Sequence, residues 1–308
     1  MKGPLSSSGR GESLDPVARC YSTWGTSYYD EFYGAQAPYP SVHADLLRSL
    51  LLSSGAKTVL DAGCGPASFL RRLGKEALDL YGFDLTPEMV AEAKKTMAAL
   101  GFDPRHFWQG SVLQSGDFVR PGLPAHYDAC VCIGVLPHVP ADQDTTVLNN
   151  LYQAVRPGGL VLVEARNALF SLFTQNRLTH AFLRNDLMRA DELLATAGPA
   201  AAPIAAALDE WQKHFRMDLP PVRRGKKDEP GYDEVLSRVH VPFVLQEQLR
   251  QTGFQEVRTF FYHYHALPPM LSGASDAFFK KVSVEMESPS DWRGHFMASA
   301  FILAATRT

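Results

Sequence analysis

The sequence predicts an α/β protein built on a doubly wound sheet, and two patterns carry that prediction. From about residue 56, short apolar runs alternate with amphipathic helical stretches, which is the order of elements in such a sheet. The first run, TVLDA, leads directly into the turn GCGPA before helical periodicity resumes. Seven segments are predicted as strands: 57–61, 78–84, 106–110, 127–133, 160–164, 254–265 and 295–307.

The helix after the second strand has the clearest end signals. Thr86 is the predicted N-cap, Pro87 suits the first helical position, Glu88 suits the first turn, and Gly101 follows the last turn. The segment RPGG at 156–159 is predicted to end a helix and to turn the chain into the fifth strand. Further helices are predicted at 41–52 and 243–253.

The organisation of the chain follows from where the alternation holds. It stops after Arg166 for roughly 75 residues, too long for a structureless loop, so we expect a mostly helical cap insertion over the sheet on the substrate side, with one mobile loop at 223–231. The predicted parts are a disordered tail at 1–15, a helical lid at 16–55, a core at 56–165 and 241–308, and the insertion at 166–240.

Composition excludes several classes of protein. The 308 residues are 45% hydrophobic, but no window approaches a membrane span and the N-terminal residues lack a secretory signal, which predicts a cytoplasmic protein with no membrane partner. Net charge is −3, and the one basic cluster, at 223–227, is followed at once by two acids, which disfavours nucleic acid as a partner. The four cysteines have no CxxC spacing, so a disulfide framework is not expected.

The turn after the first strand predicts a nucleoside site. Its glycines allow a ligand close to the backbone at a helix N-terminus, and Asp84 ends the second strand 19 residues after Gly65, as an acid that binds a ribose diol would. Asp61, two residues before Gly63, would repel a diphosphate and instead suits a cationic group such as an ammonium. The spacing differs from the dinucleotide fingerprint, and no Gly-Lys-Ser/Thr follows as in a P-loop.

These residues resemble the first motif of the class I S-adenosylmethionine-dependent methyltransferases, acid-x-Gly-x-Gly-x-Gly, with Ala67 at the third glycine. Asp84 matches the ribose-binding acid of that family, YDACVCIGVLPHVP its fourth strand, and RPGG its common turn. The resemblance implies a seven-stranded Rossmann-like methyltransferase sheet ending in an antiparallel hairpin, with S-adenosyl-L-methionine as cofactor. Many relatives have an Asp after the third strand that contacts the adenine amino group, whereas Ser111 stands there in this chain.

The resemblance also assigns a set of expected cofactor-binding residues. They come from the turn and the ends of the first four strands, together with two lid aromatics, because an aromatic face near a sulfonium is stabilising. The set is Asp61, Gly63, Cys64, Gly65, Asp84, Leu85, Met89, Gly110, Ser111, Val112, Ile133, Gly134, Tyr21 and Tyr28. The alternative for the aromatics is plain core packing.

His138 is the candidate base, because it follows the fourth strand directly and has an unperturbed pKa near working pH. His263 and His265, on one face of the sixth strand, are weaker candidates for a catalytic or substrate role. Tyr33, Arg166 and Asn167 are candidate substrate contacts. Each of these residues also has a structural alternative, and no cluster of ligands predicts a metal site.

The predicted function is therefore methyl transfer to an oxygen or nitrogen of a small-molecule metabolite. Cys132 to Val135 do not resemble the Asn/Asp-Pro-Pro-Tyr of many enzymes that methylate nucleic-acid bases. Two alternatives stay open: a non-catalytic relative that acts as a binding or partner subunit, and, more remotely, an NAD(P)-dependent oxidoreductase. The sequence leaves the acceptor and the oligomeric state open.

Overall fold

The structure is a computed structural model that describes residues 15–24, 29, 33–34, 40–222, 224 and 234–308. Seven strands form one sheet in the order β3-β2-β1-β4-β5-β7-β6, in which β7 runs antiparallel to both of its neighbours and the other neighbouring pairs are parallel. The strands are β1 (Thr58–Ala62), β2 (Asp79–Asp84), β3 (Phe107–Gln109), β4 (Tyr127–Cys132), β5 (Val155–Arg166), β6 (Phe254–Tyr264) and β7 (Ala298–Arg307). The predicted doubly wound fold is confirmed.

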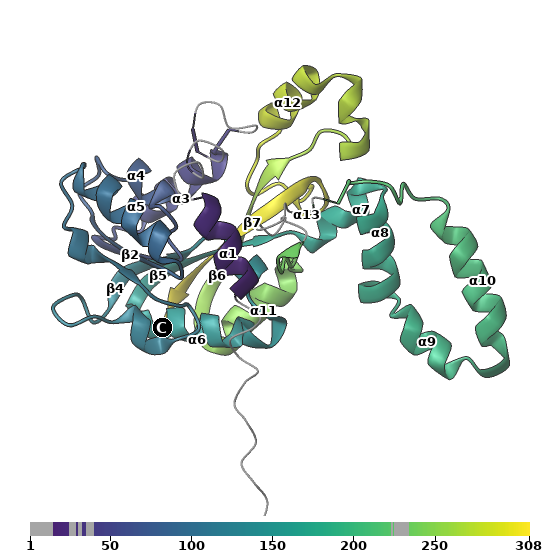
Figure 1. Ribbon diagram of the computed structural model, residues 1–308, viewed down its shortest axis with the longest axis horizontal. Helices are drawn as coiled ribbons and strands as arrows, with labels where there is room; N and C mark the ends of the chain where they lie inside the picture. Colours follow the sequence, from purple (N-terminus) through teal and green to yellow (C-terminus); the bar gives the residue numbers. More distant parts are fainter. Residues whose placement is uncertain (1–14, 25–28, 30–32, 35–39, 223, 225–233) are drawn as a thin grey trace, which may run out of the picture.

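Helices cover both faces of this sheet, and a separate apolar core lies on each (Figure 1). The alternation of side chains along a strand explains the two cores: in β1, Val59 joins the core under one face and Leu60 the core under the other. The first face carries α3 (Val42–Ser53), α4 (Ser68–Arg72) and α5 (Pro87–Ala98), and the second carries α6 (Asp144–Ala154) and α11 (Pro242–Thr252). Because both faces of the parallel strands are buried, most residues along these strands are apolar, as in the runs seen in the sequence.

The insertion is helical, as predicted, but its outer part does not lie over the sheet. Figure 1 shows its last two helices as an arm that extends to the right, beyond the side of the sheet. The chain returns at His240, which forms an isolated bridge with Asn167. The elements of the insertion are α7 (Ser171–Thr174), α8 (Arg177–Ala181), the π-helical turn η6 (Phe182–Leu187), α9 (Ala190–Thr196) and α10 (Ala201–Gln212). The loop predicted at 223–231 falls almost entirely outside the described residues.

Three further differences concern element ends. The RPGG segment belongs to β5, which begins at Val155 and shifts register against β4 near Tyr127. The predicted last strand starts later, because 294–297 form the short helix α13 (Gly294–Met297). The helix α12 (Asp276–Glu285), between the two closing strands, has no counterpart in the prediction.

The lid contributes α1 (Asp15–Trp24), which packs against α5 and begins at the last residue of the predicted tail. Residues 1–14 of that tail and Tyr28 lie outside the described residues. Val17 and Cys20 of α1 also contact Val235, at the end of the insertion. Across the described ranges, no helix is both long and apolar enough to cross a membrane. The four cysteines are free and buried.

Candidate active site

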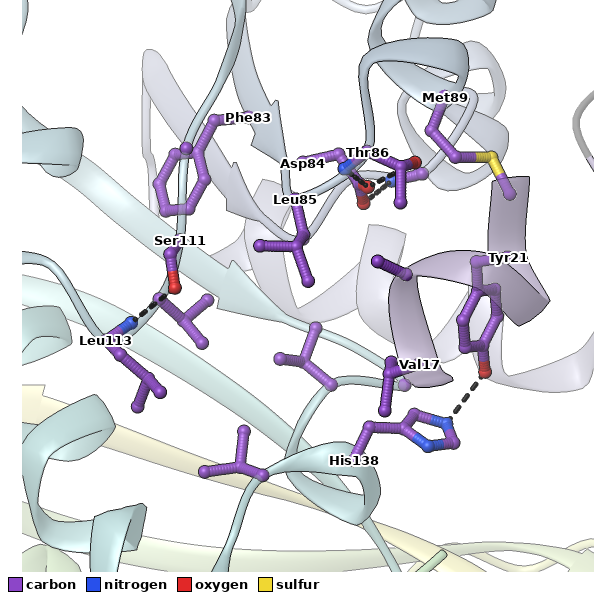
Figure 2. A pocket seen from close by; sticks show the side chains of 18 of the residues that line it. Val17, Tyr21, Phe83, Asp84, Leu85, Thr86, Met89, Ser111, Leu113 and His138 are labelled. Atoms are coloured by element: carbon purple, nitrogen blue, oxygen red, sulfur yellow. Dashed lines mark hydrogen bonds between the residues drawn. The ribbon is translucent and has the colours of Figure 1, made fainter. Parts of the chain in front are cut away.

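A cavity of about 780 Å³ opens at the carboxyl ends of β1, β2 and β4, where ligands bind in open α/β sheets. Figure 2 shows α1 along one side of it and the β2–α5 turn along another. Its lining is Val17, Ala18, Tyr21, Gly63, Gly65, Phe83, Asp84, Leu85, Thr86, Met89, Gly110, Ser111, Val112, Leu113, Ile133, Gly134, Val135, His138 and Val139.

The glycine turn forms one wall of this cavity. Gly63 and Cys64 donate their N–H groups to the Phe83 carbonyl, at 2.8 and 2.9 Å, which ties the turn to β2. Both turn glycines have positive φ, 91° at Gly63 and 53° at Gly65. A Cβ at Gly63 would lie 2.3 Å from Val135, whereas a Cβ at Gly65 would meet open space within the cavity. The turn therefore offers bare backbone to a ligand at Gly65.

Asp84 connects the turn to the second strand. One carboxylate oxygen accepts the Gly65 N–H at 2.9 Å, and the other accepts the Thr86 N–H at 3.0 Å and its hydroxyl at 3.2 Å (Figure 2). Burial raises the pKa of this carboxyl, although the same hydrogen bonds oppose the shift. Asp84 thus lines the cavity with a carboxylate whose orientation is held by three donors, as recognition of a diol requires.

Asp61 lies behind the turn, buried, and its Oδ1 has no hydrogen-bond partner among the described residues. Burial, with a smaller contribution from the charge of Asp84, raises its pKa to about 8. A buried carboxyl without a partner is costly, and a cation nearby would stabilise its ionised form. This chemistry fits a ligand whose group beside the turn is an ammonium.

The loop after β3 is organised by an acid that the sequence analysis did not single out. Asp117 accepts the Ser111 N–H at 2.8 Å, and its backbone carbonyl accepts the Trp108 indole N–H at 2.8 Å. The Ser111 hydroxyl accepts the Leu113 N–H at 3.2 Å and remains at the cavity wall. A Cβ at Gly110 would lie 2.9 Å from the Asp117 Cβ, which accounts for glycine there. Asp117 therefore shapes this wall, while Ser111 and backbone face the cavity.

His138 and Tyr21 meet at the wall of the cavity. The Tyr21 hydroxyl lies 2.7 Å from Nε2 of His138, and Nδ1 lies 2.7 Å from the Leu236 carbonyl (Figure 2). Because a carbonyl only accepts, Nδ1 carries the proton of the neutral ring and Nε2 accepts from Tyr21. Burial lowers the pKa of His138 to about 4, with a further contribution from the charge of Arg166. The ring is thus neutral at ordinary pH, with its lone pair directed at Tyr21.

Several expected site residues lie elsewhere. The Cys64 side chain turns toward β2, where a Cβ on Gly82 would lie 2.9 Å from it, and Cys64 is not among the lining residues. Asn167 is buried and donates to the carbonyls of His295 and Ala298, at 2.8 and 2.9 Å, so its amide anchors the α13 region rather than facing a substrate. Arg166 donates to the hydroxyl of Ser237, on the returning end of the insertion.

His263 and His265 do not form the shared face that the sequence predicted. His263 has a φ of 58°, in the left-handed region, so the strand alternation breaks there. Its ring contacts those of His43 and Tyr262, whereas the His265 ring contacts Phe170 and Phe279. Burial lowers the pKa of His263 to about 3 and of His265 to about 4. Neither lines the described cavity, and packing explains both.

Tyr33 is buried against His43, with ring centroids 5.1 Å apart, and does not line the cavity either. Burial and the carboxyls of Asp61 and Glu164 raise the pKa of its phenol. Seven lining residues were not predicted from the sequence; most of them are apolar and belong to no motif. They are Val17, Ala18, Phe83, Thr86, Leu113, Val135 and Val139. Among the described residues, no cluster of three or more His, Cys, Asp or Glu could hold a metal ion.

Comparison with known proteins agrees with this geometry. A family model described as a methyltransferase domain matches residues 60–161. The ubiquinone biosynthesis O-methyltransferase of Xylella fastidiosa (strain M23) is 26% identical over 167 residues, which cover 53% of this chain and 63% of the relative. The tRNA N(3)-methylcytidine methyltransferase trm140 of Schizosaccharomyces pombe is 27% identical over 167 residues, covering 49% and 53%. The chain thus spans less than two thirds of the length of these curated relatives.

The fold has a counterpart among solved structures. Magnesium protoporphyrin IX methyltransferase (ChlM) from Synechocystis PCC 6803, solved with bound SAH, superposes with a TM-score of 0.50 at 17% identity, covering 95% of this chain and 99% of that one. The sheet order, the acid-glycine turn with its ribose-type acid and the matched domain agree with one another. The matched domain and its relatives support a class I S-adenosylmethionine-dependent methyltransferase, as the sequence motifs predicted, and the solved structure shows the same fold.

Proposed function

We propose that this protein transfers a methyl group from S-adenosylmethionine to an oxygen or nitrogen of a small molecule. The observation that carries the proposal is the cavity itself: bare backbone at Gly65, the oriented Asp84 carboxylate and the Tyr21–His138 pair all border one space. Its lining combines many apolar side chains with a few polar groups, as small-molecule sites commonly do.

The residues present fit the cofactor group by group. Asp84 would accept from the two ribose hydroxyls, and the apolar side chains of Leu85 and Val112 would hold the adenine, with Ser111 at its edge. The turn at Gly63 and the buried Asp61 would take the amino-acid end, where the cation offsets the cost of burying a carboxylate. Tyr21 supports the lid side of the same cavity.

The bound cofactor supplies an electrophilic methyl group on a sulfonium. The chain must then hold the acceptor in line with it and keep water out, and such positioning can contribute on the order of 7 to 11 kcal/mol. His138 is the group placed to take the acceptor's proton, at Nε2 directly or through the Tyr21 hydroxyl. Its lowered pKa keeps Nε2 unprotonated at neutral pH, and a weak base suffices because oxygen or nitrogen becomes strongly acidic once methylated.

The support for a small-molecule acceptor is the lid helix beside the site and the weak charge of the chain. Helix α1 lines one side of the cavity through Val17, Ala18 and Tyr21, which narrows the space left for an acceptor (Figure 2). A net charge of −3 provides no field that would attract a polyanion. Several curated relatives carry the name ubiquinone biosynthesis O-methyltransferase, which favours an oxygen acceptor on a small molecule, while the tRNA relative makes transfer RNA the competing acceptor to test.

Isothermal titration with S-adenosylmethionine, S-adenosylhomocysteine and NADH tests the first half of the proposal. We expect micromolar binding of both sulfur ligands and none of NADH. Incubation with a labelled methyl donor then compares phenolic, amine and transfer RNA acceptors. Binding without transfer to any acceptor would favour a non-catalytic binding subunit. Binding of NADH without binding of either sulfur ligand would contradict methyl transfer and favour an NAD(P)-dependent oxidoreductase.

A further inference from the structure

Glu164 is a buried residue near the end of β5, and each of its two carboxylate oxygens accepts a hydrogen bond from a different part of the chain. Oε2 accepts the N–H of Gly134, just beyond β4, at 2.5 Å, and Oε1 accepts the hydroxyl of Tyr262 on β6 at 2.9 Å. The side chain is 6% exposed and burial raises its pKa. No sequence motif pointed to it.

The bond to Gly134 controls backbone that faces the cavity. Gly134 has a φ of 70° and lines the cavity together with Ile133, and the last ladder pair between β4 and β5 is Cys132 with Val163. The peptide unit between Ile133 and Gly134 therefore lies past the regular ladder. In a trans peptide the C=O and N–H point in opposite directions, so drawing the Gly134 N–H toward Glu164 turns the Ile133 carbonyl the other way.

A purely structural role explains this arrangement poorly. A buried carboxylate is expensive, and well-packed apolar residues commonly replace such groups at little or no cost in stability. Here the two donors that meet the carboxylate are one backbone N–H at the cavity wall and the hydroxyl of a buried tyrosine. Asp61, on the neighbouring β1, places a second carboxyl behind the same wall. This end of the cavity is thus rich in acceptors.

We propose that Glu164 is a positioning residue: through its hydrogen bond to Gly134 it orients the Ile133–Gly134 peptide so that the Ile133 carbonyl accepts from the ammonium of the cofactor's amino-acid end. The inference rests on the proposed function, because it requires that S-adenosylmethionine occupies the cavity. In this proposal Glu164 and Tyr262 affect binding of the amino-acid end of the cofactor and have no effect on binding of the nucleoside, which Asp84 recognises.

A pair of ligands that share the nucleoside but differ in the amino-acid end tests this separation. S-adenosylhomocysteine has that end and 5′-methylthioadenosine lacks it. In the Glu164→Leu variant, which removes both acceptors, we expect affinity for S-adenosylhomocysteine to fall tenfold or more and affinity for 5′-methylthioadenosine, measured by displacement, to stay within twofold. Glu164→Gln, which retains an amide oxygen for Gly134, should recover most of the loss.

The matched control is Asp128→Asn. Asp128 also organises backbone, accepting the N–H groups of Lys57 and Thr58 at 2.9 Å each, but at the amino ends of β1 and β4, opposite the cavity. It should lower thermal stability without changing the ratio of the two affinities. If Glu164→Leu does not fold, Tyr262→Phe, which removes one anchor of the carboxylate, should shift the ratio in the same direction by about threefold.

Equal weakening of both ligands, or of neither, in these variants would overturn the role of Glu164 and leave the proposed function intact. A wild-type protein that binds neither ligand would overturn both.

Discussion

The strand ends that form the cavity and the arm formed by α9 and α10 differ in how their side chains are used. Around the cavity, hydrogen bonds orient several polar side chains: Asp84 accepts from both Gly65 and Thr86. In α10, by contrast, no residue of the helix is buried, and in the arm Leu193 and Ile204 are exposed. The comparison shows that oriented polar groups gather at the strand ends, whereas the arm presents exposed apolar side chains.

His138 lies at the cavity and contacts the end of the insertion where the chain returns to the sheet, and its loss should have the largest effect. It joins Tyr21 of the lid to Leu236 at the returning end of the insertion. In His138→Ala we expect turnover to fall by about a hundredfold or more, the range for loss of a general base, while affinity for S-adenosylmethionine stays within about threefold. Steady-state kinetics and calorimetry give the two values.

His126→Ala is the control for this substitution, because the exposed His126 also contacts a carbonyl through Nδ1, that of Gln153 at 3.0 Å, but remote from the cavity. It should leave turnover unchanged. Full turnover in His138→Ala would show that His138 is not the base and that its hydrogen bond to Tyr21 only holds the lid helix in place.

Asp84→Ala should have the next largest effect, and it acts on binding. The variant removes the proposed acceptor for two ribose hydroxyls and releases the Gly65 N–H; hydrogen bonds to a charged group are worth about 1.5 to 3 kcal/mol each. We expect affinity for S-adenosylmethionine to fall tenfold or more by calorimetry. Asp79→Ala, at the exposed start of the same strand, should bind normally, and unchanged affinity in Asp84→Ala would remove the ribose assignment.

Sequence reasoning succeeded at this edge because its signals are local. The order acid, glycine, glycine and a second acid at the end of the next strand follows from the geometry of one strand–turn–helix unit, and the structure places Gly65 and Asp84 in contact. The contact between His138 and Leu236, 98 positions apart, has no such signal. The position of His138 after β4 was enough to predict that it faces the cavity. Its tautomer could not be predicted, because it depends on the carbonyl of Leu236, which is distant in the sequence.

The same limit explains the misplaced residues. Asn167 and His265 each directly follow the end of a strand, which is why the sequence predicted them near the cavity. In the structure Asn167 instead donates to carbonyls of the α13 region, and the His265 ring packs on Phe279 of α12. Alternation along β6 predicted a common face for His263 and His265, and the left-handed φ of His263 breaks it. Helical periodicity likewise predicted the helices of the insertion but not the surface they pack on.

Asp61 should make the affinity for S-adenosylmethionine depend on pH. This effect is smaller than the previous two, and it tests the amino-acid end of the cavity specifically. With a pKa raised to about 8, the carboxyl is mostly protonated at pH 7 in the free protein. Binding an ammonium favours its ionised form, so binding must release a proton and affinity must rise with pH toward 8. We expect a several-fold, and at most tenfold, weakening from pH 8 to pH 7.

Calorimetry in buffers of different ionisation enthalpy counts the released proton directly. Asp61→Asn should bind more weakly and release none, and 5′-methylthioadenosine should release none from the wild type. Equal proton release by both ligands would place the titrating group elsewhere in the cavity.

The arm should give the smallest effect, and it tests whether the contrast between the two regions extends to the acceptor. Leu193 is 56% and Ile204 41% exposed, so Leu193→Gln and Ile204→Gln remove little packing and should each change the free energy of unfolding by about 0.5 kcal/mol or less. Affinity for S-adenosylmethionine should change by less than twofold, because neither residue lines the cavity. The informative readout is KM for the acceptor once one is found. An unchanged KM places acceptor binding wholly at the sheet edge, while a raised KM with unchanged cofactor affinity would return the arm to the substrate side, where the sequence first placed the insertion.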